Sequence, residues 1–263
     1  MTDLAIYGFG AFGRELAAIV RSINEAAPRW NVIGYFDDGV PEGRSNRYGG
    51  VIGGLGALNR HERPLAVVMA IASPDTVRAL VSKITNPLVH FPNLVAPTVL
   101  FFDRESVGMG RGNILGHNCR ISCDVELGDF NLLNGEVSLG HDVKTGSFNV
   151  MQPDVRLSGA VTVGDGNFFG ARALVLQGVA IGRGTSSETL AGVTRRSSPR
   201  ADGTDLYWLE ARPQDAGRVT LVRRRDGRVE DVSPPDHNVR TRYLEYGGGD
   251  YAAVDGTVLW VDF

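Results

Sequence analysis

The sequence predicts an α/β domain, then a solenoid of short stacked strands, then a segment of antiparallel β structure. Three observations indicate this order: a glycine-rich turn near the N-terminus, a six-residue apolar repeat in the middle, and closely spaced hairpin signals near the C-terminus. The expected limits are 1–97, 98–185 and 186–263. At 263 residues the chain is long enough to bury a substantial core.

Composition excludes several classes of function. The net charge of −3 gives no reason to expect binding to nucleic acid or to an acidic membrane surface. There is no run of about 18 apolar residues and no signal-peptide pattern, so we expect a soluble cytoplasmic protein without membrane insertion. Cys119 and Cys123 are the only cysteines, too few for a zinc site, and we expect small buried side chains and no metal.

The first 38 residues match the order of a dinucleotide-binding unit. A strand over 3–7 runs into the turn Gly8-Phe9-Gly10-Ala11-Phe12-Gly13, followed by a helix over 14–23 and a strand over 30–36. Glycines in such a turn let backbone amides approach a phosphate at the helix N-terminus. Asp37 and Asp38 follow the second strand and could take ribose hydroxyls or a base edge.

Three interpretations of this turn remain open. A redox NAD site needs a full two-half sheet, yet the α/β pattern ends near residue 95. A half-size domain that holds a nucleotide-linked ligand suits the length better. In the third interpretation, the glycine turn only packs the helix against the strand.

The rest of the first domain is predicted from local patterns. Strands are expected over 48–52 and 65–71, followed by a helix from Pro74 to Ile84 with Ser73 as its N-cap. Residues 91–97 contain two prolines and are expected to form an extended connector.

The middle of the chain carries a strict six-residue repeat. Thirteen consecutive positions, of which twelve are apolar, share this spacing: Met109, Leu115, Ile121, Leu127, Leu133, Leu139, Thr145, Met151, Leu157, Val163, Phe169, Val175 and Ile181. A period of six fits neither a helix nor a single strand, but it fits a solenoid in which each apolar residue stacks on its counterpart.

Within the repeat, the chemistry concentrates at Gly140-His141-Asp142. A carboxylate beside a histidine can fix its tautomer and raise its basicity, as a general base requires. The alternative is a turn histidine that hydrogen-bonds a neighbouring coil, and the residues alone do not choose between the two. His117 occupies an equivalent position without an acid, and we expect it to be structural.

Residues 1–185 resemble the two-domain sugar acyltransferases of the sialic acid O-acetyltransferase and UDP-4-amino-sugar N-acetyltransferase type. The resemblance rests on the following stretches: Ile6-Tyr7-Gly8 with its glycine turn, Tyr35-Phe36-Asp37-Asp38, Phe91-Pro92-Asn93-Leu94, Gly140-His141-Asp142, Phe148 to Pro153, Leu157-Ser158-Gly159, Val163-Gly164-Asp165-Gly166 and Phe169-Gly170-Ala171. The resemblance implies a Rossmann-like N-terminal domain and a left-handed parallel β-helix.

The resemblance also implies an acetyl-CoA-dependent reaction on a nucleotide sugar. His141 would be the general base, and Asp142 the acid that raises its basicity. The nucleotide sugar would lie against Ala11, Phe12, Gly13, Asp37 and Asp38. Gly159, Gly170 and Ala171 would line the acetyl-CoA channel, where a backbone amide could hold the thioester oxygen.

Two further features of that family bear on function. Its β-helix is trimeric with sites between subunits, which implies a homotrimer here. A second histidine that touches the donor commonly follows nine residues after the first, and here that position is Val150. The alternative to an acyltransferase is therefore a non-catalytic protein that has lost donor binding and still binds a sugar nucleotide.

After Gly184 the repeat stops and short strands are expected instead. These are predicted over 205–212, 218–225, 228–232, 239–246, 250–254 and 257–263, with hairpin turns at Asp226-Gly227 and Asp255-Gly256. The segment resembles the start of the β-propeller of prolyl-oligopeptidase-like serine peptidases, in Leu206 to Glu210, Asn238 to Arg242 and Glu245 to Gly249. The chain has no Gly-x-Ser-x-Gly, so peptidase activity is not expected. The segment is either a fusion, a rearrangement or assembly artefact, or a domain that caps the open end of the solenoid.

Overall fold

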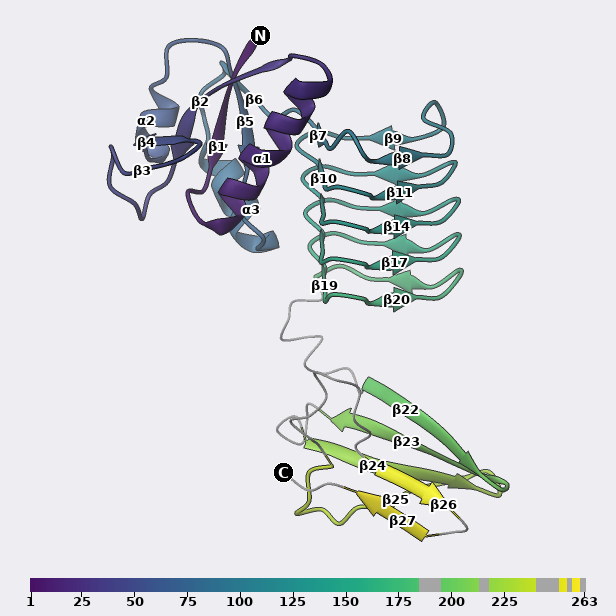
Figure 1. Ribbon diagram of the computed structural model, residues 1–263. Helices are drawn as coiled ribbons and strands as arrows, with labels where there is room; N and C mark the ends of the chain where they lie inside the picture. Colours follow the sequence, from purple (N-terminus) through teal and green to yellow (C-terminus); the bar gives the residue numbers. More distant parts are fainter. Residues whose placement is uncertain (185–194, 213–217, 240–250, 255–256, 261–263) are drawn as a thin grey trace. The chain divides into compact units, whose positions relative to one another are not determined.

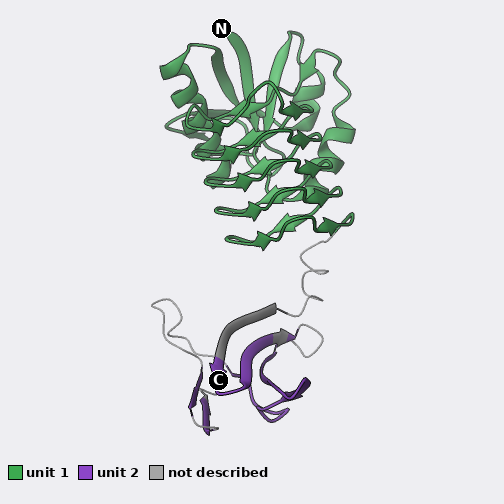
Figure 2. Ribbon diagram, turned by 90° about the vertical axis from the view of Figure 1, so that its right-hand side faces the viewer, with its two compact units in different colours: residues 1–186 green, residues 187–263 purple. Residues whose placement is uncertain are grey.

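The computed structural model describes residues 1–184, 195–212, 218–239, 251–254 and 257–260. The chain divides into two compact units, Met1–Ser186 and Ser187–Phe263 (Figure 2). Among the described residues, each buried apolar cluster contains residues of one unit only. The first unit holds both the α/β domain and the six-residue repeat.

The α/β domain is built on a six-stranded sheet in the order β3-β4-β2-β1-β5-β6. The strands are β1 (Thr2–Tyr7), β2 (Trp30–Phe36), β3 (Ser45–Asn46), β4 (Gly49–Gly53), β5 (Leu65–Met69) and β6 (Val89–His90). All neighbours pair in parallel except β3 and β4. Leu4, Ala5 and Ile6 of the central strand are fully buried, because the sheet is covered on both faces. The four strands predicted for this domain are confirmed, three of them with slightly shifted ends.

Three helices accompany the sheet: α1 (Ala11–Ala26), α2 (Leu55–Asn59) and α3 (Pro74–Lys83). The predicted cap of α3 is confirmed, since the Ser73 hydroxyl accepts a hydrogen bond from the Thr76 amide at 3.4 Å. Helix α2 was not predicted. It has five residues, and its first amide, Leu55 N–H, donates to Asp38 at 2.8 Å, a contact 17 residues away that no local pattern reveals.

The six-residue repeat forms a parallel β-helix, as predicted (Figure 1). Its two-residue strands stack into three sheets: β7-β10-β13-β16-β19, β8-β11-β14-β17-β20 and β9-β12-β15-β18-β21. The strands are β7 (Leu94–Val95), β8 (Leu100–Phe101), β9 (Gly108–Met109), β10 (Ile114–Leu115), β11 (Arg120–Ile121), β12 (Glu126–Leu127), β13 (Leu132–Leu133), β14 (Ser138–Leu139), β15 (Lys144–Thr145), β16 (Val150–Met151), β17 (Arg156–Leu157), β18 (Thr162–Val163), β19 (Phe168–Phe169), β20 (Leu174–Val175) and β21 (Ala180–Ile181). Because β7 already pairs with β10, the first coil begins before the expected limit at residue 97. The left-handed sense stays a prediction.

A left-handed backbone residue at every turn explains the period of six. Residues 112 to 184 at six-residue intervals all have positive φ: four are glycines with φ of 68° to 71°, and nine are other residues with φ of 53° to 66°. Each follows a member of the apolar repeat by three positions. None of the nine is β-branched, as the strain of β-branched side chains in this region requires.

Four buried asparagines form a ladder inside the β-helix: Asn113, Asn131, Asn149 and Asn167. Each side-chain oxygen of the first three accepts hydrogen bonds from both the backbone and the side-chain nitrogen of the asparagine 18 residues later, at 2.9 to 3.1 Å. The ladder satisfies polar groups that would otherwise be unpaired in an apolar core.

The second unit is antiparallel, as predicted. A four-stranded sheet has the order β22-β23-β24-β25, and β26 pairs with β27 as a hairpin. The strands are β22 (Arg195–Asp202), β23 (Asp205–Arg212), β24 (Arg218–Arg225), β25 (Arg228–Asp231), β26 (Tyr251–Val254) and β27 (Thr257–Trp260). The turn at Asp226-Gly227 is confirmed by its two positive φ angles, 50° and 77°. The predicted turn at 255–256 lies outside the described residues. The same holds for the strand predicted over 239–246, of which only Val239 is described.

Candidate functional site

His141 and Asp142 lie together at one corner of the β-helix, between β14 and β15. Asp142 is one of the left-handed turn residues, with φ of 58°, and its carboxylate lies 2.7 Å from His141 Nδ1. Both side chains are more than half exposed, at 53% and 59%. The pair therefore faces the outside of the coil, where a second molecule can reach it.

The chemistry of the pair follows from which atom can carry a proton. An ionised carboxylate only accepts hydrogen bonds, so His141 Nδ1 is the donor and Nε2 of the neutral ring carries the free lone pair. Asp142 thus holds the imidazole in the tautomer that a general base needs.

Gly159 lies one coil further along the same corner, 18 residues after His141. The two residues are neighbours because the Ala160 amide donates to the His141 carbonyl at 2.8 Å. A Cβ atom at Gly159 would lie only 2.4 Å from His141 Nε2, so the imidazole occupies the space that any other side chain would fill. Gly159 is buried, and its N–H has no hydrogen-bond acceptor in the described part of the chain. A backbone amide without an acceptor in the chain can donate a hydrogen bond to a ligand oxygen or to water.

Gly170 and Ala171 lie at a different corner. Ala171 belongs to the column of turn residues that also contains His117, Gly135 and Pro153, because each following amide donates to the previous carbonyl in that column. A single chain therefore presents Gly159 and Ala171 at two separate edges of the coil. At the second corner, His117 Nδ1 lies 3.0 Å from the Thr98 hydroxyl, which also accepts from the Asn118 amide. His117 is thus held in a local network, and its structural role stays a prediction.

Val150 is at the position where the resembling family commonly has a second histidine, and it is 3% exposed. It lies on β16 and joins the buried cluster that contains Leu16 and Val20 of helix α1. This face of the β-helix is therefore covered by the α/β domain, and the Val150 side chain is not presented to solvent.

In the α/β domain, the glycine turn brings β1 and α1 close together. A Cβ at Gly13 would lie 2.1 Å from the Gly8 carbonyl oxygen, so only glycine fits there. Gly10 is the N-cap of α1 and forms no side-chain cap, which leaves the first amides of the helix without a side-chain acceptor. Phe12 packs against the core, while Ala11 is exposed.

Asp37 and Asp38 both hold neighbouring loops in place. Asp37 accepts from the Phe9 and Gly39 amides, each at 2.8 Å. Asp38 accepts from the Leu55 amide and from the Tyr7 hydroxyl. Burial, and then the hydrogen bond to Asp38, raise the pKa of Tyr7 above its ordinary value, so the hydroxyl remains a donor.

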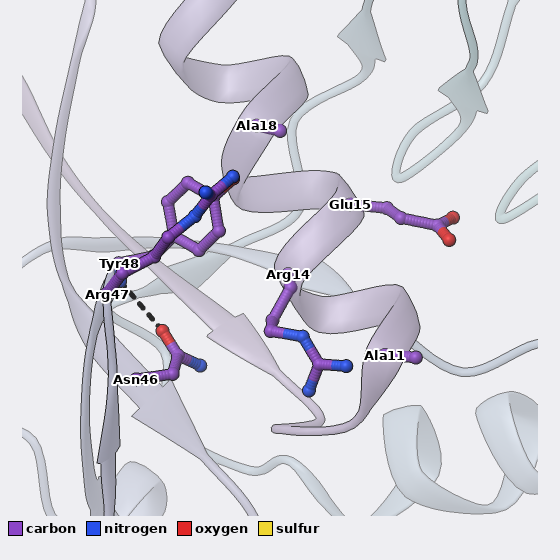
Figure 3. A pocket seen from close by; sticks show the side chains of 7 residues that line it. All are labelled: Ala11, Arg14, Glu15, Ala18, Asn46, Arg47 and Tyr48. Atoms are coloured by element: carbon purple, nitrogen blue, oxygen red, sulfur yellow. Dashed lines mark hydrogen bonds between the residues drawn. The ribbon is translucent and has the colours of Figure 1, made fainter.

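A cavity of about 550 Å³ lies beside Ala11 (Figure 3). It is lined by Arg14 and Glu15 of α1 and by Asn46, Arg47 and Tyr48 of the β3–β4 hairpin. Sequence reasoning missed these residues. The one usable signal was the spacing of three between Ala11 and Arg14, which places both on the same face of a helix.

Metal clusters and membrane-spanning helices are two further features that bear on function. Among the described residues, no group of three or more His, Cys, Asp and Glu side chains is arranged to hold a metal ion. In the same part of the chain, no helix combines the length and the apolar character needed to cross a bilayer.

The chain is similar to known proteins in its N-terminal domain and in its fold. Residues 3–84 match the family model of the PglD N-terminal domain. No curated protein matches the sequence. Among solved structures, the chain is similar to a variant of GDP-perosamine N-acetyltransferase from Caulobacter crescentus in complex with CoA and GDP-perosamine, with 17% identity over 69% of this chain and 91% of that chain and a TM-score of 0.51.

Two more structures extend this comparison. PerB from Caulobacter crescentus, also in complex with CoA and GDP-perosamine, shows 17% identity over 69% of this chain and 92% of that chain, with a TM-score of 0.51. The acetyltransferase domain of PglB from Neisseria gonorrhoeae shows 16% identity over 69% of this chain and 97% of that chain, with a TM-score of 0.46. The two Caulobacter structures show a shared fold over about two thirds of this chain. The peptidase-propeller resemblance of the second unit receives no support from these comparisons.

Proposed function

We propose that the chain is an acetyl-CoA-dependent acyltransferase that transfers an acetyl group to an amino or hydroxyl group of a nucleotide-activated sugar. The observation that carries the proposal is the meeting of His141, Asp142 and the buried Gly159 amide at one corner of the β-helix. The shared fold with a structure named as a GDP-perosamine N-acetyltransferase favours an amino group as the acceptor.

In this proposal, His141 Nε2 takes the proton from the attacking amine or hydroxyl. Asp142 stabilises the imidazolium that forms, because its carboxylate stays 2.7 Å from Nδ1. General-base catalysis of this kind contributes roughly 10²- to 10⁴-fold to the rate.

Gly159 has a second role through its backbone. When bound, acetyl-CoA supplies a thioester, the activated acyl group of the reaction. The Gly159 N–H can donate a hydrogen bond to an oxygen on which negative charge develops, next to the base. The absence of a side chain at Gly159 leaves the space that the His141 imidazole occupies.

A second copy of the chain would complete the donor channel. Gly170 and Ala171 lie at another corner than His141 and Gly159, so a channel that uses all four needs the edge of a neighbouring subunit. This geometry is consistent with the homotrimer that the family resemblance implies.

The nucleotide sugar would bind at the N-terminus of α1. The uncapped amides there favour a negatively charged group, and Ala11 borders the open cavity. Asp37 and Asp38 would orient the turn through Phe9 and Leu55, and their remaining lone pairs could contact the ligand.

The alternative is a protein that binds a sugar nucleotide without transferring an acetyl group. Its support is Val150, which is buried where the related enzymes commonly carry a donor-contacting histidine.

A direct assay separates the two. Thiol release from acetyl-CoA would be followed with a panel of amino-sugar nucleotides, and acetyl-CoA binding would be measured by calorimetry. We expect His141→Ala to lower the rate by about 10²- to 10⁴-fold with little change in binding. The matched control is His117→Ala, which removes the histidine of the other corner and should keep the rate. Full activity of His141→Ala would refute the proposal, and absence of acetyl-CoA binding to the unaltered chain would favour the alternative.

A further inference from the structure

The cavity between helix α1 and the β3–β4 hairpin carries a set of polar groups that the proposed chemistry does not use. Arg14 and Glu15 reach it from the first turns of α1, and Asn46, Arg47 and Tyr48 from the hairpin (Figure 3). The cavity begins at Ala11, so it adjoins the uncapped N-terminus of the helix.

The charged groups of the cavity favour an anion. The Arg14 side chain forms no ion pair or hydrogen bond with any described residue. The Arg47 guanidinium stacks 4.6 Å from the centre of the Tyr48 ring and donates to the Tyr48 hydroxyl. The one carboxylate of the lining, Glu15, points away from the hairpin residues in Figure 3. Two guanidinium groups therefore face the cavity without a carboxylate between them.

Two buried polar groups at the same place have no partner. Tyr35 on β2 is fully buried, and its hydroxyl forms no hydrogen bond. The oxygen of the Asn46 side chain accepts from the Tyr48 amide at 2.8 Å, but its buried nitrogen has no acceptor. The Asn46 side chain lies near the Tyr35 hydroxyl, though not in full hydrogen-bond geometry, and Tyr48 and Arg14 act on the hydroxyl electrostatically. The Tyr35 hydroxyl therefore lies beside these residues of the cavity lining.

These unpaired groups are donors. Burial raises the pKa of Tyr35, so its hydroxyl keeps its proton at neutral pH, and an amide nitrogen can only donate. Buried donors without acceptors are costly unless a ligand or water supplies the acceptor. The cavity thus combines two cations with two unsatisfied neutral donors and needs a ligand rich in acceptor oxygens.

We infer that this cavity binds the diphosphate of the nucleotide sugar, with Arg14 and Arg47 as the phosphate-binding side chains and Tyr35 and Asn46 as additional donors. The inference rests on the proposed function for the identity of the ligand. Guanidinium groups match phosphate oxygens in geometry and charge, and the helix N-terminus at Ala11 adds backbone amides at the same end of the cavity.

The test is calorimetric titration of the full chain with UDP and GDP, without acetyl-CoA, beside titrations with uridine and guanosine. Arg14→Gln and Arg47→Gln should each weaken binding of the tighter diphosphate by about tenfold or more, since hydrogen bonds to charged groups are strong. Tyr35→Phe removes only the hydroxyl and should weaken binding severalfold without lowering the melting temperature. Arg63→Gln, an exposed arginine of the same domain, is the charge-matched control and should bind like the unaltered chain.

The outcomes separate this inference from the proposed function. Diphosphate binding that weakens in the two arginine variants, with nucleoside binding unchanged, supports the inference whether or not acetyl transfer is found. Equal binding by the variants and the unaltered chain, an equal loss for nucleosides and diphosphates, or no diphosphate binding at all would overturn it. Transfer that depends on His141 but not on Arg14 would overturn the inference and leave the proposed function standing.

Discussion

Replacement of Gly159 by alanine tests the position of His141 without removing the imidazole. The added Cβ would lie 2.4 Å from Nε2, whereas ordinary contacts begin at 3.4 Å, so the ring must move by about 3.4 − 2.4 = 1.0 Å. A misplacement of about 1 Å can cost on the order of 10²-fold in rate. The backbone of Gly159 is not in the left-handed region, and the ring is 53% exposed and can turn outward, so the free energy of unfolding should change little.

The matched control is Gly135→Ala. Gly135 follows His117 by one coil as Gly159 follows His141, but a Cβ there would meet only the His117 carbonyl oxygen, at 3.5 Å. The assay is the initial rate of thiol release from acetyl-CoA, together with NMR signals of the His141 ring. We expect a loss of about 10²-fold in the Gly159 variant and no loss in the Gly135 variant.

Two results would refute this reasoning. One is a Gly159→Ala protein with an unaltered His141 ring signal and an unaltered rate, because the ring would then not occupy the space above Gly159. The other is an equal loss of rate in both variants, which would indicate a general effect of alanine at the turns. A shifted ring signal with no measurable transfer in any protein would keep the geometry and count against the proposed reaction.

Three further predictions concern stability and accessibility. Asn131→Ala should lower the free energy of unfolding by about 2 to 4 kcal/mol in urea, because it removes the acceptor of both Asn149 nitrogens and one of the two donors to the Asn113 side-chain oxygen; a loss below about 1 kcal/mol would argue against the ladder. Burial raises the pKa of Cys119 to about 11, so an aromatic disulfide reagent should label Cys123 in the folded chain and Cys119 only after unfolding; rapid labelling of both thiols would contradict the buried position. A chain without residues 187–263 should keep the melting temperature of the first unit, since no buried cluster spans both units among the described residues; aggregation of that chain would instead favour the capping role.

The β-helix could be predicted from the sequence because its cause is local. Each coil repeats the same backbone conformation every six residues, so the apolar residue and the left-handed turn residue recur at fixed positions. Aromatic residues at the turn position also adopt the left-handed backbone conformation. Phe130 and Phe148 take positive φ and stack with ring centres 5.3 Å apart, and Arg78 lies 5.0 Å from the Phe148 ring.

The elements that were missed depend on distant partners. Strand β22 contains Pro199, which argues against a strand when only the local sequence is considered. It is tolerated because β22 is an edge strand and its register with β23 shifts between Ser197 and Arg200. Helix α2 likewise depends on Asp38, a residue that sequence reasoning assigned to the ligand.

The candidate site residues also separate into those predicted from local sequence and those that depend on distant partners. His141 and Asp142 were predicted because they are adjacent in the chain, and the structure places their side chains in contact. Arg14 and Arg47 were not predicted, because 33 residues separate them and only the fold of the β3–β4 hairpin brings them to one cavity. Site residues that are adjacent in the chain could be predicted from the sequence, while residues brought together only by the tertiary fold could not.

The coil period also decides how many chains an active site needs. Residues 18 apart lie at the same corner of the β-helix. Backbone hydrogen bonds between coils therefore hold His141 next to Gly159, while Ala171 lies at another corner. Side-chain movement cannot bring Ala171 to the corner of His141, because positive φ angles and hydrogen bonds between coils fix the backbone of each turn. If Ala171 takes part in donor binding, the donor must lie between two copies, and acetyl transfer per chain should fall on dilution below the assembly concentration. Nucleoside diphosphate binding, which uses residues of one domain only, should not fall in the same range.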